Sequence, residues 1–190
     1  MSRSIATWND LISDEQHKDL LRGYHPLDEF FIVGPEFFTL WFFQSRSAFI
    51  SQNRFKKWSR EALNDYVLIP AMPGYVWRTD CFFASHFWRT REDPDPDGET
   101  LRLHQTEPEP QTWSHTWADW TCMPQHPRLP PEKKYFYHDL RTMLGVIRNT
   151  SFIYFHPPFR PRLWILYEIA EYHLTRSGGI GEASDTKPLP

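Results

Sequence analysis

The sequence has few cysteines, no long hydrophobic run and no apolar leader, and each shortage excludes a class of protein. Two cysteines, Cys81 and Cys122, are too few for a disulfide-stabilised secreted scaffold, so we expect reduced thiols and a cytoplasmic location. The most apolar run, residues 37–43, is far shorter than the ~20 residues that a membrane-spanning helix needs. The first ten residues lack the apolar segment of a secretory signal. We therefore expect no integral membrane segment.

Charge and glycine content exclude further functions. The formal net charge of −3 gives no sign of a nucleic-acid partner. Without a glycine-rich phosphate loop, the chain has neither a Rossmann nor a P-loop site. The histidines and cysteines lack zinc-like spacing, and the acidic run at residues 93–97 is interrupted by prolines, so we expect no metal. Aromatic residues are abundant at 17%, which suits either a dense core or an aromatic-lined pocket.

The chain divides near residue 75, where a helical pattern gives way to alternating strands and helices. We expect residues 1–75 to form a helical extension, which ends in a linker rich in Pro and Gly at residues 69–74. The helices expected there run from Ser13 to Gly23, from Pro35 to Gln52 and from Arg54 to Tyr66. Residues 76–176 form the expected α/β domain, and the polar residues 177–190 read as a disordered tail.

Within residues 76–176 the order of elements predicts a parallel sheet. The expected strands are residues 80–85, 116–121 and 151–155, and the expected helices are residues 99–107, 132–148 and 161–174. Ligands of such sheets bind outside the carboxyl ends of the strands. Those ends carry Ser85 and His86, Thr121 and Cys122, and Phe155 and His156.

Glu168 is the leading candidate for a catalytic residue, because it lies in a helix that is apolar on almost every side. Helical periodicity places Trp164 and Tyr172 beside it, and places four apolar residues on the opposite face. We expect that opposite face to pack on the sheet; it consists of Leu163, Leu166, Ala170 and Leu174. Partial burial raises the pKa of a carboxyl, which is how catalytic acids and bases are tuned. The alternative is a surface glutamate paired with Arg160 or Arg162.

Three segments in order, residues 82–88, 117–125 and 162–168, resemble Toll/interleukin-1 receptor (TIR) domains. They are most similar to TIR-like proteins of fungi, algae and bacteria that carry an S-H-x-W strand end and a C-x-P-Q segment. The resemblance covers about residues 78–175. It implies a flavodoxin-like three-layer α/β/α fold with a short parallel sheet. This fold would be reduced at its C-terminus, because the polar tail holds no pattern for the family's last strands.

The resemblance also implies an activity. Many TIR domains hydrolyse the nicotinamide N-glycosidic bond of NAD+ with a glutamate in the helix after the third strand. In a W-x-x-x-E pattern, that glutamate corresponds to Glu168, with Trp164 one turn earlier. The chain would then be an NAD+ nucleosidase of immune or cell-death signalling, with NAD+ as its substrate and no cofactor. TIR enzymes often act only when assembled, which implies self-association through TIR-like surfaces.

The remaining candidates are residues that suit parts of NAD+. We expect Trp88, Trp120 and Trp164 to stack on nicotinamide, Arg89 to hold the pyrophosphate, and Ser85 and His86 to contact the ribose. His86 and Asp119 also have structural readings, as a buried histidine and a paired or capping aspartate. The alternative function is a non-catalytic TIR-like interaction module. An enzyme requires a cleft that Glu168 shares with Ser85 and Trp88, whereas a module is compatible with Glu168 buried in a salt bridge.

Overall fold

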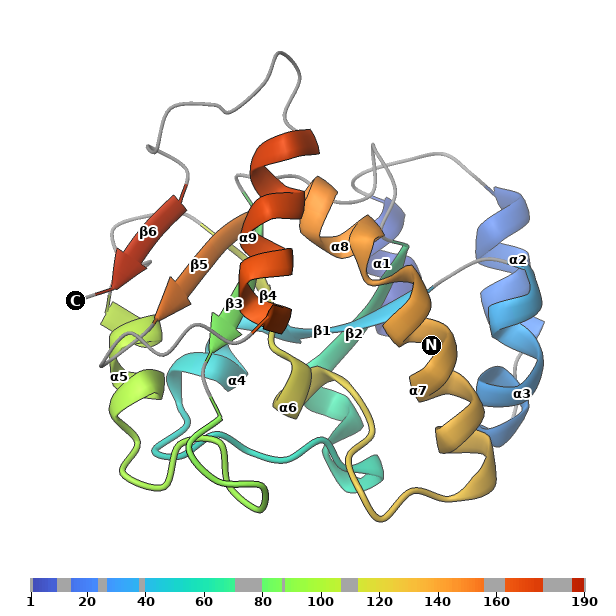
Figure 1. Cartoon of the computed structure of the whole chain (residues 1–190). Coiled ribbons are helices and arrows are strands. Elements are labelled where there is room, and N and C mark those ends of the chain that lie inside the picture. The colour runs from blue at the N-terminus through green and yellow to red at the C-terminus, as the bar shows by residue number, and fades with distance from the viewer. Residues whose placement is uncertain are drawn as a thin grey trace.

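A six-stranded sheet organises the chain, with the strand order β2-β1-β4-β3-β5-β6 (Figure 1). Its strands are β1 (Leu40–Ser45), β2 (Tyr66–Pro70), β3 (Cys81–His86), β4 (His115–Trp117), β5 (Ser151–Phe155) and β6 (Thr186–Leu189). β1 runs antiparallel to both β2 and β4. The other strands pair in parallel, β4 with β3, β3 with β5, and β5 with β6. The molecule is therefore a mixed α/β protein with a partly parallel sheet.

The computed structural model describes residues 2–9, 15–23, 27–37, 40–70, 80–86, 88–106, 113–155, 163–175 and 186–189. Its helices are α1 (Ser2–Asn9), α2 (Glu15–Gly23), α3 (Leu27–Phe37), α4 (Arg46–Ile50), α5 (Glu99–Thr106), α6 (Asp119–Cys122), α7 (Pro130–Thr142), α8 (Leu144–Asn149) and α9 (Leu163–Thr175), with one 3-10 helix, η1 (Arg60–Asp65). Within these residues, no helix combines the length and the apolar character that crossing a membrane requires.

The N-terminal region contributes strands as well as helices, which corrects two predictions. The predicted helix from Pro35 to Gln52 is wrong at residues 40–45, which form β1 between β2 and β4. A run of aromatic residues suits a strand with neighbours on both sides, because such a strand needs no polar alternation. The predicted helix from Arg54 to Tyr66 is reduced to the 3-10 helix η1, and β2 follows at once. Residues 1–75 are therefore not a purely helical extension.

The predicted linker begins inside β2, at Ile69 and Pro70, and its remaining residues lie outside the described part of the chain. The start of the predicted helix at Ser13 also lies outside it, but α2 ends at Gly23 as expected.

Most elements predicted after residue 75 are confirmed, with three corrections. β3, β5 and α5 occupy the expected positions. The strand predicted at residues 116–121 ends at Trp117, because the chain turns into α6. The helix predicted at residues 132–148 is divided at Met143 into α7 and α8. The tail predicted as disordered contributes β6, which pairs with β5. A strand therefore does follow the helix that carries Glu168.

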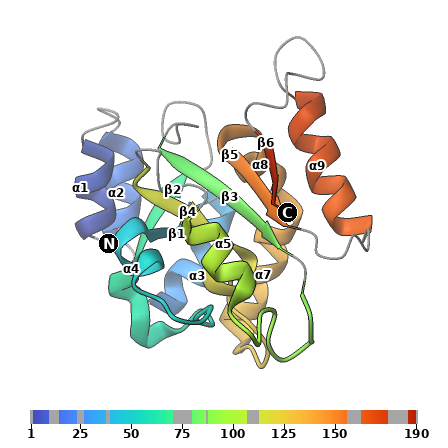
Figure 2. The ribbon, with the colours of Figure 1, turned by 90° about the vertical axis from the view of Figure 1, so that its left-hand side faces the viewer.

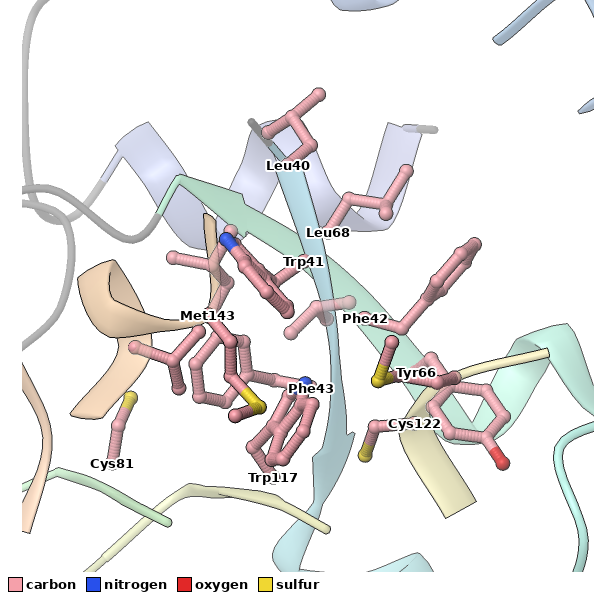
Figure 3. Close-up of a cluster of buried hydrophobic side chains, with 14 of the residues drawn as sticks. Leu40, Trp41, Phe42, Phe43, Tyr66, Leu68, Cys81, Trp117, Cys122 and Met143 are labelled. Atoms are coloured by element: carbon pink, nitrogen blue, oxygen red, sulfur yellow. The ribbon is translucent and has the colours of Figure 1, made fainter. Parts of the chain in front are cut away.

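Two clusters of buried hydrophobic side chains form the core, and the larger one extends over both faces of β1. The larger core joins α3, α7 and α8 to strands β1 and β2, and Trp41 and Phe43 of β1 are fully buried in it (Figure 3). Trp41 meets Trp117 of β4 edge to face, with 5.7 Å between ring centroids. The smaller core includes Phe82 and Leu101 and lies under α4 and α5. Helices thus cover both faces of the sheet, with α9 and α5 on opposite sides (Figure 2).

Candidate active site

Helix α9 meets the sheet with the face opposite to the predicted one. Leu163, Leu166 and Leu174, which the sequence places against the sheet, are 84%, 43% and 69% exposed. The buried side chains are Ile165, Glu168 and Tyr172, which share one helical face. The prediction that Glu168 points away from the main body is therefore wrong. The helix is apolar all round, so hydrophobicity alone could not select its inner face.

Glu168 lines a cavity of about 290 Å³ at the carboxyl end of β3. The cavity is also lined by Phe83, Ala84, Ser85, His86, Trp88, Trp117, Asp119, Trp164 and Ile165. The structure therefore brings five predicted site residues, Ser85, His86, Trp88, Trp164 and Glu168, around one space. The other five lining residues were not assigned to the site by the sequence analysis, and Trp117 and Asp119 are among them.

The Glu168 carboxyl is buried and hydrogen-bonded, and the alternative partners Arg160 and Arg162 lie outside the described residues. Ser85 Oγ donates to its Oε2 at 2.5 Å, and only 4% of the residue is exposed. Burial, together with the negative charge of Asp119, raises the pKa of Glu168 to about 8, although hydrogen bonds from Ser85 and Trp164 oppose the shift. At neutral pH the group is therefore mostly protonated. A positive charge close to a carboxyl favours its ionised form.

Asp119 is a second carboxylate of this cavity, and N–H donors fix its orientation. It lies in the first turn of α6 and accepts hydrogen bonds from the backbone N–H of Trp120, at 2.6 Å, and from Trp88 Nε1, at 3.0 Å. His86 Nε2 lies 3.5 Å from its Oδ1. The Asp119 side chain is 34% exposed, in contrast to that of His86, of which 1% is exposed. The sequence analysis placed Asp119 inside a strand; in the structure it lies just after the short strand β4, where parallel sheets carry ligand-binding residues.

His86 is held by ring stacking on both of its faces. Its ring stacks on Phe55, with 4.9 Å between centroids, and on Trp88, with 6.5 Å. His104 meets it edge to face, and burial lowers the pKa of His104 to about 3, so that neighbour is neutral. The imidazole therefore has one fixed position beside Asp119.

The other predicted site residues lie at the edge of the cavity or outside it. Trp164 is 42% exposed and separates the cavity from an apolar groove of about 620 Å³ between α9 and the junction of α7 and α8. Trp120 does not line the cavity; it is buried and packs edge-on against Trp88 at 5.1 Å. Arg89 forms ion pairs with Asp97 and Glu99. These pairs direct Arg89 to the α5 side, away from the predicted pyrophosphate contact.

The acidic run at residues 93–97 provides a hydrogen-bond acceptor for the start of α5. The Asp95 carboxylate is buried and accepts the backbone N–H groups of Thr100, at 3.1 Å, and Leu101, at 2.8 Å. Gly98, with a φ of 66°, occupies the left-handed conformation that the chain needs before the helix starts.

One group of described residues has the side-chain types of a metal site, at the other end of the sheet. Asp80, Cys81 and His115 place their ligand atoms within 4.8 Å of one another. Cys81 and His115 are partners in the β3–β4 register, so sheet pairing accounts for their proximity. His115 Nδ1 lies 3.7 Å from the Asp80 carboxylate, and this contact lowers the pKa of Asp80. This group stands at the amino ends of β3 and β4, away from Glu168.

Chemically, the cavity suits a flat aromatic cation. It combines indole rings with the Glu168 carboxyl, and both features favour positive charge. No family model matches the sequence, and neither comparison with curated proteins nor comparison with solved structures gives a match.

Proposed function

We propose that the protein is a TIR-like NAD+ hydrolase in which Glu168 is the catalytic carboxylate. The observation that carries the proposal is the state of Glu168. Its carboxyl is 4% exposed, accepts a hydrogen bond from Ser85, and faces a cavity lined by the indoles of Trp88, Trp117 and Trp164. A buried acid of raised pKa beside aromatic rings is typical of catalytic sites.

The arrangement of the strands supports the proposal. Numbered along the chain, the parallel strands β3, β4, β5 and β6 lie in the spatial order 2-1-3-4. A flavodoxin-like sheet has the order 2-1-3-4-5, with its ligand site outside the carboxyl ends of the strands. The helix that carries Glu168 follows the third parallel strand, and its cavity lies at the carboxyl end of the first. We therefore propose a flavodoxin-like fold with β1 and β2 added to one edge.

The chemistry required of Glu168 is stabilisation of positive charge. In NAD+ the nicotinamide ring is cationic, and the electron pair of the glycosidic bond goes to its nitrogen as the bond to C1′ of the ribose breaks. Nicotinamide thus leaves as a neutral molecule and needs no acid. The ribose becomes oxocarbenium-like, and an ionised carboxylate beside it stabilises that charge.

Binding of the substrate and ionisation of Glu168 are coupled in this proposal. An opposite charge within about 4–6 Å lowers the pKa of a carboxyl by about 1–3 units, so the cationic ring converts Glu168 to its reactive form. Ser85 Oγ then holds the carboxylate, while Trp88 and Trp164 offer faces for the ring. The proposal thus gives a role to each of these cavity side chains.

The direct test is whether the purified protein releases nicotinamide from NAD+. The released nicotinamide is measured by chromatography at several protein concentrations. We expect wild type to release nicotinamide and Glu168→Ala to release none. Glu171→Gln is the matched control, since Glu171 lies on the same helix but pairs with Arg148. Equal release from wild type and Glu168→Ala refutes the proposal. A specific activity that rises with protein concentration supports assembly into an active oligomer.

The second candidate function is the self-assembling module without activity. The outer face of α9 favours it, because Leu163, Leu166 and Leu174 are exposed beside an apolar groove. This candidate predicts oligomers in analytical ultracentrifugation and no release of nicotinamide at any concentration. Immune or cell-death signalling, a cytoplasmic location and self-association remain predictions from the resemblance and composition.

A further inference from the structure

The cavity holds two carboxyl groups in contrasting environments, which points to different roles. Glu168 is deeply buried and is hydrogen-bonded through Ser85. Asp119 accepts two N–H donors, and 34% of its side chain is exposed. Contact with water gives the Asp119 carboxylate a route for proton exchange. Paired carboxyls in unlike environments commonly divide the acid–base work of a reaction.

Hydrolysis leaves one task that Glu168 does not perform. As the oxygen of the attacking water bonds to C1′ of the ribose, one of its protons must pass to a base. Nicotinamide leaves neutral and accepts no proton, and the Glu168 carboxylate faces the positive ribose. The structure offers a second oxygen base among the lining residues of the same cavity, at Asp119.

We propose that Asp119 is the general base of this hydrolysis. The Asp119 carboxylate takes one proton from the attacking water, the water oxygen bonds to C1′, and the proton then passes to solvent through the exposed side of the carboxylate. The backbone N–H of Trp120 and Trp88 Nε1 hold the Asp119 carboxylate in place by hydrogen bonds. The inference rests on the proposed NAD+ hydrolysis and assigns the residue that activates the water.

The experiment compares hydrolysis with base exchange, in which a pyridine replaces nicotinamide on the ribose. A pyridine nitrogen attacks C1′ without losing a proton, so exchange needs Glu168 but no general base. Wild type, Asp119→Asn and Glu168→Gln are each incubated with NAD+ and isotope-labelled nicotinamide, and both ADP-ribose and labelled NAD+ are measured. Asp19→Asn is the control, because Asp19 is 70% exposed on α2.

General-base catalysis contributes about 10²–10⁴-fold, so we expect Asp119→Asn to lose at least about 100-fold in hydrolysis while its exchange rate stays within about threefold of wild type. Glu168→Gln is expected to lose both reactions, and Asp19→Asn neither. Equal losses of hydrolysis and exchange in Asp119→Asn give Asp119 a structural role and overturn the inference alone, as does unchanged hydrolysis. A wild type that performs neither reaction overturns the proposed function, and this inference with it.

Discussion

Replacing Glu168 by glutamine gives a test of the site that depends on no substrate. Burial raises the pKa of Glu168 from its ordinary 4.5 to about 8. That difference corresponds to about 5 kcal/mol of preference for the protonated carboxyl in the folded protein. Between these two pH values the folded protein holds a proton that the unfolded chain has released. Stability therefore falls as pH rises through this window, by about 1.4 kcal/mol per pH unit.

Glutamine has the shape of the protonated carboxyl and does not titrate. We expect Glu168→Gln to match wild type most closely near pH 4.5 and to become the more stable protein as pH rises. The gain should reach about 3 kcal/mol at pH 7 and about 5 kcal/mol above pH 8, where it becomes constant. The assay is urea unfolding of both proteins at steps of one pH unit. The buried carboxyl of Asp139 titrates in both proteins, so it cancels in the difference.

Glu171→Gln is the control for this experiment, and its effect has the opposite sign. Glu171 Oε1 lies 2.6 Å from Arg148 Nη2, so the substitution removes an ion pair and lowers stability, by about 0–1 kcal/mol for a pair near the surface. A stability difference between Glu168→Gln and wild type that stays constant from about pH 5 to pH 8 would refute the buried, uncharged carboxyl.

Three further predictions follow from the site and the fold. If ionised Glu168 acts on NAD+, kcat/KM rises about tenfold per pH unit below pH 8 and is constant above it; a flat profile between pH 6 and 8 contradicts this. Asp95→Ala removes the acceptor of two backbone N–H groups in the first turn of α5, and we expect thermal unfolding to show a loss of about 1–3 kcal/mol. Phe43→Ala, in the buried β1, should lose about 3–5 kcal/mol in urea unfolding, against less than about 0.5 for the exposed Ile32→Ala. Equal losses of stability in Phe43→Ala and Ile32→Ala would contradict the place of β1 in the core.

Local sequence signals were sufficient where a segment carried its own boundaries. The short apolar runs of β3 and β5 and the turn residues before α5 predicted those elements correctly. The aromatic run of β1 was ambiguous, because a short buried strand and a buried helix share the same apolar pattern. β6 has little apolar character, so its sequence does not predict a strand. It forms a strand by pairing with β5, a contact that only the tertiary structure supplies.

The sequence predicted many of the residues of the candidate site, but less of how they are arranged. Ser85 and Trp88 were found by their position at the end of β3, and Glu168 by its apolar surroundings. Asp119 was read as structural because residues 116–121 were taken for a strand, whereas the chain turns into α6 there and presents this carboxylate to the cavity. Arg89 was assigned to the substrate, but its acidic partners Asp97 and Glu99 lie on the α5 side, which spacing alone did not reveal.

The stability and the activity of this protein should be governed by one titration. A buried Glu168 lowers stability by up to about 5 kcal/mol at high pH, which is a large part of the 5–15 kcal/mol that holds a domain folded. The same burial makes the ionised carboxylate a strong attractor for a cation, because little solvent screens it. The pH at which the Glu168→Gln stability difference becomes constant must therefore coincide with the pH at which kcat/KM becomes constant, near 8. Two different midpoints would mean that another group controls the reaction, even if Glu168 titrates as described.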